Sequence, residues 1–191
     1  MLHEQIGKDQ SCPIPALVLP WFALRVRSHQ ERIAAAHLHQ LGYQEFVPTY
    51  KTESRWSDRK KEIDRLLFPG YVFCRLDPSK RLPVLKAPGV VDLVGFGKVP
   101  APLADQEIEA IRRMVQSGLL VMPWPFLERG HRVLIEHGPL AGVEGILDDV
   151  KGKCRLVVSV NLLQRSVSAE IDRSWVRPLP PHKADRSTRW A

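Results

Sequence analysis

Two groups of side chains in the sequence are suited to binding, and no group is suited to catalysis. The first group is aromatic, because residues 68–73 read Phe-Pro-Gly-Tyr-Val-Phe. The second is basic, because residues 51–65 contain six lysines and arginines and only four acidic residues. Aromatic rings supply large contact areas at low entropic cost, and basic side chains attract phosphate. No Walker loop, GxSxG or HExxH motif occurs. The sequence therefore predicts a binding protein and not an enzyme.

The cysteines and histidines predict neither a metal site nor a disulfide. Cys12, Cys74 and Cys154 lie far apart and form no CxxC motif, so reduced thiols in a cytoplasm are the simplest account. His37 and His39 are two residues apart on an expected helix, so their side chains point in different directions. We expect no metal and no other cofactor.

Charge and hydropathy favour a cytoplasmic protein with basic surfaces. The formal net charge is +7, and residues 21–117 hold 16 basic and 11 acidic residues, against 8 and 7 in residues 126–180. A moderate positive field favours contact with nucleic acid or an acidic protein, although a solvated basic face is the alternative. No apolar run approaches the roughly 20 residues that a membrane helix needs. The polar segment Met1–Gln10 does not resemble a signal peptide.

The elements that position these side chains begin with a β-α-β unit. Aromatic and β-branched residues predict a strand over 21–26. Ser28 and Glu31 have the spacing of a capping box, and apolar residues recur behind them at helical intervals up to Gly42. A second strand is expected over 45–47, so the opening is β-α-β.

Residues 20–117 are expected to complete this first domain, after an irregular or disordered arm over 1–19. Proline and glycine confine any helix between 78 and 89 to a turn or two. The further expected elements are an exposed loop or long hairpin over 51–65, a turn that runs into a strand over 66–75, a strand over 90–94, and a helix that Asp105 caps, with Ile108, Ile111 and Val115 as its apolar stripe.

The remaining chain predicts a small five-stranded antiparallel β-barrel over 126–180. Short β-prone runs alternate there with turns that contain Gly, Pro or Asp. We interpret the uncharged segment 118–125 as a linker and 181–191 as a disordered tail. The expected strands cover 132–136, 143–148, 154–160, 166–171 and the region of Val176.

A glycine pattern in the first barrel hairpin is the most specific signal in the sequence. Alternation places two apolar side chains on one strand face, a Gly-Pro pair turns the chain, and Gly142 permits a backbone conformation or a close approach that a side chain would block. By itself this pattern predicts only a hairpin, but its spacing resembles the KOW motif. The matching residues are Gly130, Val133, Ile135, Gly138, Pro139, Gly142 and Gly145.

With the aromatic run, this motif resembles the NusG-type family of transcription elongation factors, which join an NGN domain to a KOW barrel. The aromatic run resembles the Phe-Pro-Gly-Tyr strand of the NGN domain. Other family elements occur in matching order: Trp21-Phe22, the first helix, Pro48-Thr49-Tyr50, Gly89-Val90 and the helix from Asp105. The resemblance covers about residues 20 to 180, and it implies an α+β fold class in which an antiparallel sheet flanked by helices precedes the KOW barrel.

The resemblance implies that the first domain binds the clamp helices of the largest RNA polymerase subunit. Such a contact would favour the closed clamp, suppress pausing and modulate termination. Strand alternation predicts that Tyr71 and Phe73 share one face. The positions that match the family's polymerase-binding patch are Phe22, Tyr50, Phe68, Tyr71, Phe73 and Leu93.

Two stretches resemble specialised, operon-specific paralogues of the RfaH and UpxY kind: Val157–Val167 and Val94–Pro100. A general NusG factor is the alternative.

The specialised paralogues read exposed non-template DNA, and the positions that match their DNA-reading residues are Arg25, Arg27, Gln30 and His37. The basic segment could touch upstream DNA through Arg55, Arg59, Lys60 and Lys61. A solvated surface is the alternative for both sets. In RfaH a His-Thr-Thr triplet contacts the opposite pincer of polymerase. The region near residues 81–83 of this chain is shorter and contains no such triplet.

By family analogy, the KOW barrel binds a small ribosomal subunit protein or the termination helicase. An RNA-binding or ribosome-associated KOW protein is the competing interpretation, but it predicts a strongly basic barrel. β-branched residues over 157–167 favour strands, so we expect a stable barrel and not the refolding to a helical hairpin that RfaH undergoes. We expect a monomer with no membrane contact.

Overall fold

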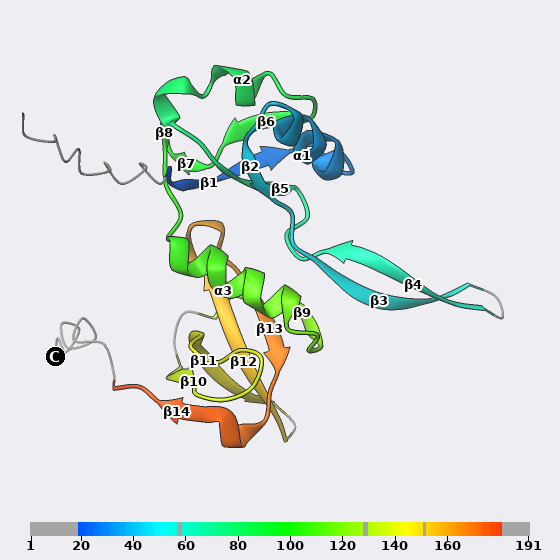
Figure 1. Cartoon of the computed structure of the whole chain (residues 1–191), viewed down its shortest axis with the longest axis vertical. Coiled ribbons are helices and arrows are strands. Elements are labelled where there is room, and N and C mark those ends of the chain that lie inside the picture. Colours follow the sequence, from blue (N-terminus) through cyan, green and yellow to red (C-terminus); the bar gives the residue numbers. More distant parts are fainter. Residues whose placement is uncertain (1–18, 57–58, 128–129, 151, 181–191) are drawn as a thin grey trace, which may run out of the picture.

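The computed structural model describes residues 19–56, 59–127, 130–150 and 152–180. The expectations about the N-terminal arm, including Cys12, and about the tail from 181 fall outside this part of the chain. Two antiparallel sheets lie at opposite ends of the molecule, and helix α3 (Asp105–Gln116) lies between them (Figure 1).

The first sheet has four antiparallel strands in the order β2-β5-β1-β6. Strand β1 pairs with β5 from Trp21↔Arg75 to Arg25↔Tyr71. These elements confirm the predicted mixed α+β class. Their bounds are β1 (Trp21–Val26), α1 (Glu31–Gln40), β2 (Gln44–Phe46), β5 (Tyr71–Arg75), a 3-10 turn (Pro78–Lys80), α2 (Leu82–Leu85) and β6 (Val90–Leu93).

Strand alternation gives the first sheet two apolar faces. Phe22 and Leu24 lie in one buried cluster with Ala34 and Leu38 of α1. The alternate residues, such as Trp21, belong to a second cluster, which includes α3 and the other sheet. A sheet that is apolar on both faces must be covered on both. Helix α1 covers one face, and α3 with the second sheet covers the other.

Helix α1 does not begin with the predicted capping box. Its N-cap is Gln30, which makes no side-chain cap hydrogen bond, and His29 before it adopts a left-handed φ of 65°. The helix therefore starts too late for Ser28 to serve as the cap. The Glu31 carboxylate instead accepts a hydrogen bond from the Gly70 N–H at 2.8 Å.

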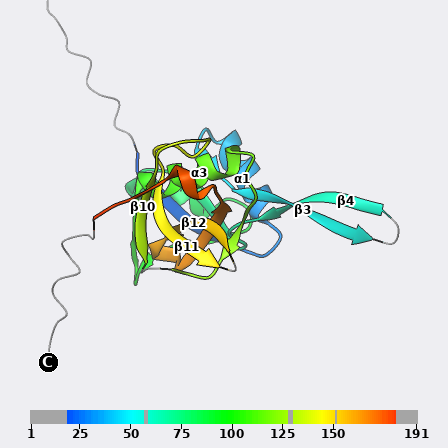
Figure 2. The ribbon, with the colours of Figure 1, turned by 90° about the horizontal axis from the view of Figure 1, so that it is seen from below.

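The charged segment over 51–65 forms a long hairpin, one of the two predicted alternatives. Strands β3 (Thr49–Trp56) and β4 (Arg59–Leu66) pair only with each other, from Thr49↔Leu66 outward. The hairpin projects from the body of the molecule (Figure 2). A second, very short hairpin pairs β7 (Gly95–Phe96) with β8 (Val99–Pro100).

Helix α3 lies where it was predicted, but its N-cap and its buried apolar residues differ from the prediction. Its N-cap is Ala104, and Asp105 reaches away to pair with Arg75 of the first sheet instead of capping the helix. The fully buried residues of α3 are Ile108, Ile111 and Met114. The predicted Val115 is only half-buried, because the adjacent Met114 takes the buried position.

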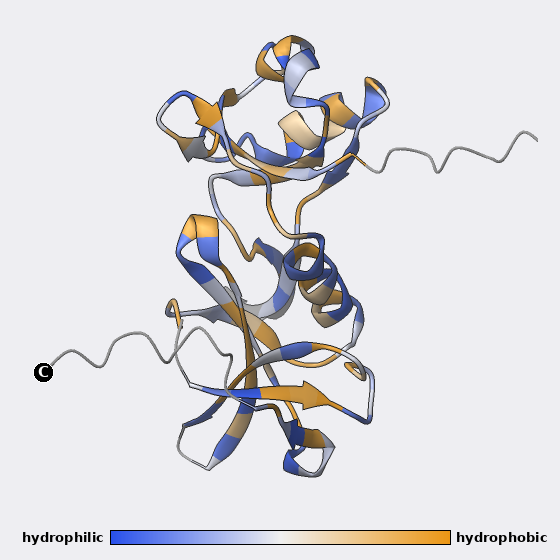
Figure 3. Cartoon of the chain, turned by 90° about the vertical axis from the view of Figure 1, so that its left-hand side faces the viewer, coloured by the Kyte–Doolittle hydropathy of each residue, from blue (hydrophilic) through white to orange (hydrophobic). Residues whose placement is uncertain are grey.

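The second sheet contains the five predicted strands and one more. Strand β9 lies within the segment interpreted as a linker and pairs with β13, so this segment is part of the sheet. Hydrophobic and hydrophilic stretches are mixed along the ribbon of this sheet (Figure 3). The strands are β9 (Val121–Trp124), β10 (His131–Ile135), β11 (Glu144–Val150), β12 (Lys153–Val160), β13 (Arg165–Glu170) and β14 (Val176–Pro178), in the order β14-β10-β11-β12-β13-β9.

The glycine motif makes the turn that its pattern predicts. Gly138 and Gly142 adopt φ values of 79° and 85°, and the Gly142 N–H donates to the Ile135 carbonyl. Gly145 serves a different purpose, because a Cβ there would lie 2.6 Å from the Val157 carbonyl oxygen. Strands β11 and β12 can therefore approach only without a side chain at this position.

Replacement of Gly145 by Ala should destabilise the second sheet. The added methyl group meets a backbone oxygen that cannot move aside, so we expect the free energy of unfolding to fall by about 1–3 kcal/mol. Denaturant unfolding of the full chain measures this loss. The control is Glu144→Ala at the exposed neighbouring position, which should change stability by no more than about 0.5 kcal/mol. Equal effects of both substitutions would contradict the packing argument.

Candidate functional site

Aromatic side chains gather on the side of the first sheet that faces α3 and the second sheet. The rings of Phe68 and Phe73 meet edge to face with centroids 5.3 Å apart, and Phe46 lies 6.2 Å from Phe73. Tyr50 and Tyr71 are half-buried against the same cluster, so Tyr71 and Phe73 share a face as their spacing predicts. We call this surface the aromatic face; its residues are Trp21, Phe46, Tyr50, Phe68, Tyr71 and Phe73.

Four of the six predicted polymerase-binding residues belong to the aromatic face, and two do not. Phe22 and Leu93 lie in the other cluster, beneath α1. Phe22 neighbours Trp21 on β1 and so points to the opposite side of the sheet. Leu93 pairs with Leu24, which also faces α1. The structure therefore does not bring these two residues to the surface that the other four form.

A turn of the second sheet covers the aromatic face. The turn joins β12 to β13 over residues 161–164, and we call this turn together with Arg165, the first residue of β13, the tip. Its Leu163 is buried, and its Leu162 is half-buried against the cluster that contains Phe68 and Phe73. These two phenylalanines are only 1% and 0% exposed. We call this arrangement the covered state.

Arg165 makes the closest polar contacts between the tip and the aromatic face. Its guanidinium lies 5.1 Å from the centroid of the Tyr71 ring. Its Nη1 also donates to the Pro69 carbonyl at 3.2 Å. A cation over an aromatic ring contributes about 0.5–2 kcal/mol, depending on how much water is excluded. Arg165 therefore holds the tip against the Pro69-Gly70 turn.

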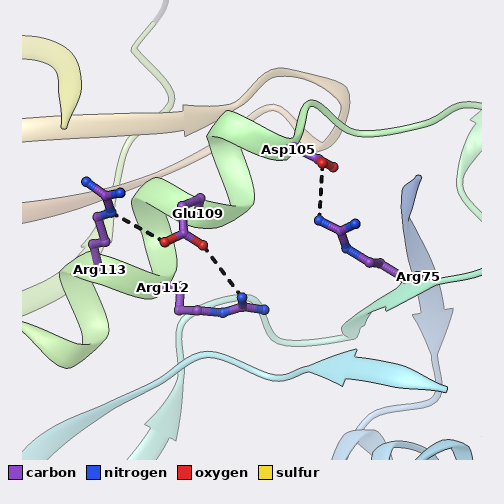
Figure 4. A network of polar contacts seen from close by, with 5 residues as sticks. All are labelled: Arg75, Asp105, Glu109, Arg112 and Arg113. Atoms are coloured by element: carbon purple, nitrogen blue, oxygen red, sulfur yellow. Dashed lines mark hydrogen bonds and ion pairs between the residues drawn. The ribbon is translucent and has the colours of Figure 1, made fainter. Parts of the chain in front are cut away.

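Helix α3 joins the two sheets through charged side chains (Figure 4). Asp105 pairs with Arg75 of β5 at 3.1 Å, and Glu109 pairs with both Arg112 and Arg113. Arg112 also lies over the rings of Trp21 and Phe46, at 5.5 and 5.2 Å. In the other direction, Arg113 donates to the Ala141 carbonyl of the second sheet.

Glu107 of α3 connects directly to the tip. Its Oε1 accepts a hydrogen bond from the Asn161 side-chain amide at 2.9 Å. Burial raises the pKa of the Glu107 carboxyl above its ordinary value of 4.5, and the hydrogen bonds from Asn161 partly oppose this shift. Burial disfavours the charged form, so the covered state binds a proton at this site more tightly than an open state would.

Three of the four residues predicted to read DNA lie along one edge of the first sheet. The Arg27 N–H donates to the Gly89 carbonyl, and the Gln30 side chain packs on Gly89. His37 lines a groove of about 410 Å³ that Ile33 and Pro88 also line. The exposed Arg25 lies on β1, two residues before Arg27.

The four basic residues predicted to touch upstream DNA lie in the outer half of the long hairpin. The register pairs Arg55 with Lys60 and places Arg59 and Lys61 on either side of that pair. The side chains over 53–61 lie outside the described part of the chain. Closer to the body, Lys51 pairs with Glu62 at 3.0 Å.

The thiols and acidic groups do not form a metal site in the part of the chain that the structure describes. No group of three or more potential ligands occurs there. Cys74 and Cys154 are free and buried, and burial raises the pKa of the Cys74 thiol to about 12. Such a thiol is a poor nucleophile at neutral pH. Among the described residues, no helix is both long and apolar enough to cross a membrane.

Sequence reasoning missed Trp21, Arg165 and Glu107 as parts of the site. Trp21 could have been found from the sequence, because it alternates with Ala23 and so shares a face of β1 with it. No local pattern in the sequence points to Arg165, because its partner Pro69 is 96 residues away along the chain. Glu107 likewise meets Asn161 across 54 residues.

Comparisons with known proteins agree with this architecture. A family model described as "Transcription termination factor nusG" matches residues 19–112. The "Transcription termination/antitermination protein NusG" of Escherichia coli K12 is 32% identical over 155 residues, covering 78% of this chain and 85% of that protein. Its counterpart in Pseudomonas aeruginosa is 31% identical over 156 residues, covering 79% and 88%. These relatives are transcription factors.

A solved structure supports the fold. The structure titled "Domain interaction in Thermotoga maritima NusG" superposes with a TM-score of 0.51 at 19% identity. It covers 84% of this chain and 97% of that chain.

The substitution Glu107→Gln should make the stability of the chain less dependent on pH. Glutamine keeps the oxygen that accepts from Asn161 but carries no charge to bury. The variant should therefore be more stable than the natural chain at neutral pH, and the difference should shrink as the pH falls toward the ordinary value of 4.5. Denaturant midpoints of both proteins across this range test the prediction. A difference that stays constant with pH would contradict it.

Proposed function

Because the chain belongs to the NusG family of transcription termination and antitermination factors, we propose that it binds RNA polymerase through the aromatic face. The observation that supports this proposal most directly is the gathering of Tyr50, Phe68, Tyr71 and Phe73 on one side of the first sheet. Aromatic clusters of this kind dominate the energetics of protein interfaces. The partner surface is the clamp helices of the largest polymerase subunit, and binding there suppresses pausing and modulates termination.

In the covered state, the tip occupies the surface that polymerase would bind. Polymerase binding therefore requires the second sheet to move away, and the measured affinity is reduced by the fraction of molecules that are covered. The second sheet keeps its β-structure while it covers the face. Release thus requires separation of folded parts and no refolding of the KOW barrel.

The covering contact favours an operon-specific role over a general one. The stretch Val157–Val167, which resembles specialised paralogues, supplies the tip. The stretch Val94–Pro100 forms the small hairpin, which exposes 77% of Phe96 and 71% of Val99. A factor whose polymerase surface is covered acts mainly where another signal opens it. Non-template DNA at the Arg27, Gln30 and His37 edge is the proposed signal, and the long hairpin adds contacts to upstream DNA.

Removal of the Arg165 side chain should increase the affinity for polymerase. Arg165→Ala loses the contacts with Tyr71 and Pro69 that hold the tip, so the covered fraction falls. We expect binding to purified bacterial core RNA polymerase to tighten about three- to tenfold. Fluorescence anisotropy or biolayer interferometry measures this change. The matched control is Arg173→Ala, a surface arginine of the second sheet that pairs with Asp149. Unchanged or weaker binding by Arg165→Ala would contradict a covering role.

Loss of the Tyr71 ring should weaken the polymerase contact itself. To separate this effect from release of the tip, Tyr71→Ala is compared with Tyr71 intact, both in the Arg165→Ala background. We expect at least about a tenfold loss of affinity, as for a central aromatic residue of an interface. Phe96→Ala, which removes an exposed aromatic ring elsewhere, is the control. Equal losses from both substitutions would argue against the aromatic face as the binding surface.

Transcription assays distinguish an operon-specific factor from a general one. Pause lifetimes and terminator read-through are measured with the purified chain on templates that carry the leader of its own operon and on unrelated templates. We expect shorter pauses and more read-through only with its own leader. Effects on every template would indicate a general NusG factor. Recovery of ribosomal RNA without polymerase subunits would indicate the ribosome-associated alternative.

A further inference from the structure

Glu31 is the one charged side chain that is buried among the described residues. It is 3% exposed, and its Oε1 accepts a hydrogen bond from the Gly70 N–H at 2.8 Å. Burial of a carboxylate is costly unless polar groups compensate for the lost water. The first turn of α1 supplies part of this compensation through the positive end of the helix dipole, and the Gly70 amide supplies a direct donor.

The partner of Glu31 lies inside the turn that carries two residues of the aromatic face. Gly70 separates Pro69 from Tyr71 and adopts a φ of 85°, a conformation that favours glycine. Its carbonyl accepts from the Val26 N–H at 2.8 Å. Both polar backbone groups of Gly70 are therefore bound, one to the end of β1 and one to α1. The turn that they fix sets the directions in which Phe68 and Tyr71 leave the backbone.

Two side chains hold this turn from different parts of the molecule. Arg165 of the tip binds the Pro69 carbonyl, and Glu31 of α1 binds the Gly70 amide. When the tip leaves, the contact from Arg165 is lost, and the contact from Glu31 stays because α1 packs on the first sheet. Glu31 is thus the side chain that remains on the turn when the aromatic face is open.

We propose that Glu31 is a positioning residue for polymerase binding, an inference that rests on the proposed function of the aromatic face. Glu31 holds the Phe68–Tyr71 turn in its binding conformation after the tip has left. A preorganised turn loses less conformational entropy on binding and so binds more tightly. Glu31 acts through the acceptor oxygen that its side chain places at the Gly70 amide.

Three substitutions at this position separate the acceptor from the charge. Glu31→Gln keeps an acceptor oxygen at the same reach and removes the charge. Glu31→Asp keeps the charge but shortens the side chain by one methylene, which withdraws the acceptor from Gly70. Glu31→Ala removes both. Glu136→Ala, which removes a carboxylate of the second sheet that pairs with Arg177, is the control.

The experiment measures the Gly70 amide and the polymerase affinity of the same full-length proteins. Each variant is made in the natural chain and with Arg165→Ala, so that the covering tip does not mask the result. Amide exchange by NMR reports on the Glu31 hydrogen bond. We expect exchange at Gly70 to accelerate about tenfold in Glu31→Ala and Glu31→Asp. Affinity for core RNA polymerase should fall about fivefold or more in both, whereas Glu31→Gln stays within about twofold of the natural residue.

The outcomes separate the positioning role from the proposed function. An amide of Gly70 that stays protected in Glu31→Asp overturns the positioning role, even if polymerase binds. Faster exchange with unchanged affinity overturns it as well, and so does an equal loss of affinity in Glu31→Gln. If Glu31→Ala does not fold, the comparison of Glu31→Asp with Glu31→Gln still decides. If the chain with the natural residue fails to bind polymerase in either background, the proposed function is wrong, whatever the exchange at Gly70 shows.

Discussion

The structure depends on one shared apolar core that neither sheet could close by itself. The aromatic face of the first sheet, the buried side of α3 and the inner side of the second sheet form a single cluster. Burial of a large apolar side chain contributes about 1.5–3 kcal/mol, so Phe68 and Phe73 alone make separation of the parts costly. A surface of this kind needs a partner. The tip of the second sheet is the partner within the chain, and polymerase is the proposed partner outside it.

Polar contacts around this core determine geometry more than they add stability. Exposed ion pairs such as Arg113–Glu109 contribute little, about 0–1 kcal/mol each. Such contacts fix the orientation of α3, because Asp105 pairs with Arg75 of β5 and Glu107 binds Asn161 of the tip. The covered state is therefore one defined arrangement of the two sheets. Its polar contacts can be exchanged for contacts with water at small cost when a competing partner binds the aromatic face.

This balance connects the architecture to the proposed role. If tip and polymerase compete for one surface, whatever binds the free tip also favours polymerase binding, because such effects are reciprocal. The KOW barrel can take part without refolding, since it is already a β-structure in the covered state. Glu31 completes the arrangement from the other side, because it holds the turn between Phe68 and Tyr71 independently of the tip.

Much of the fold could be predicted from the sequence, because its causes are local. Aromatic and β-branched residues over 21–26 and within 66–75 predict strands, whose successive side chains must face opposite ways, and the glycines at 138 and 142 predict a turn that only their backbone freedom allows. The segment over 118–125 could not be recognised as a strand in the same way. Its prolines and lack of charge favour a linker, its apolar residues indicate only that part of it packs, and pairing with β13 is what makes it β9.

The sequence by itself determined that Tyr71 and Phe73 share a face and that the aromatic residues are suited to binding. Only the tertiary structure decided what covers that face and which polar groups hold it. Glu31 illustrates the difference: its spacing from Ser28 predicts a local cap, yet its carboxylate binds Gly70, 39 residues away. The physical reason is that periodicity follows from backbone geometry within a few residues, whereas a buried polar group takes whichever partner the folded chain brings within hydrogen-bonding distance.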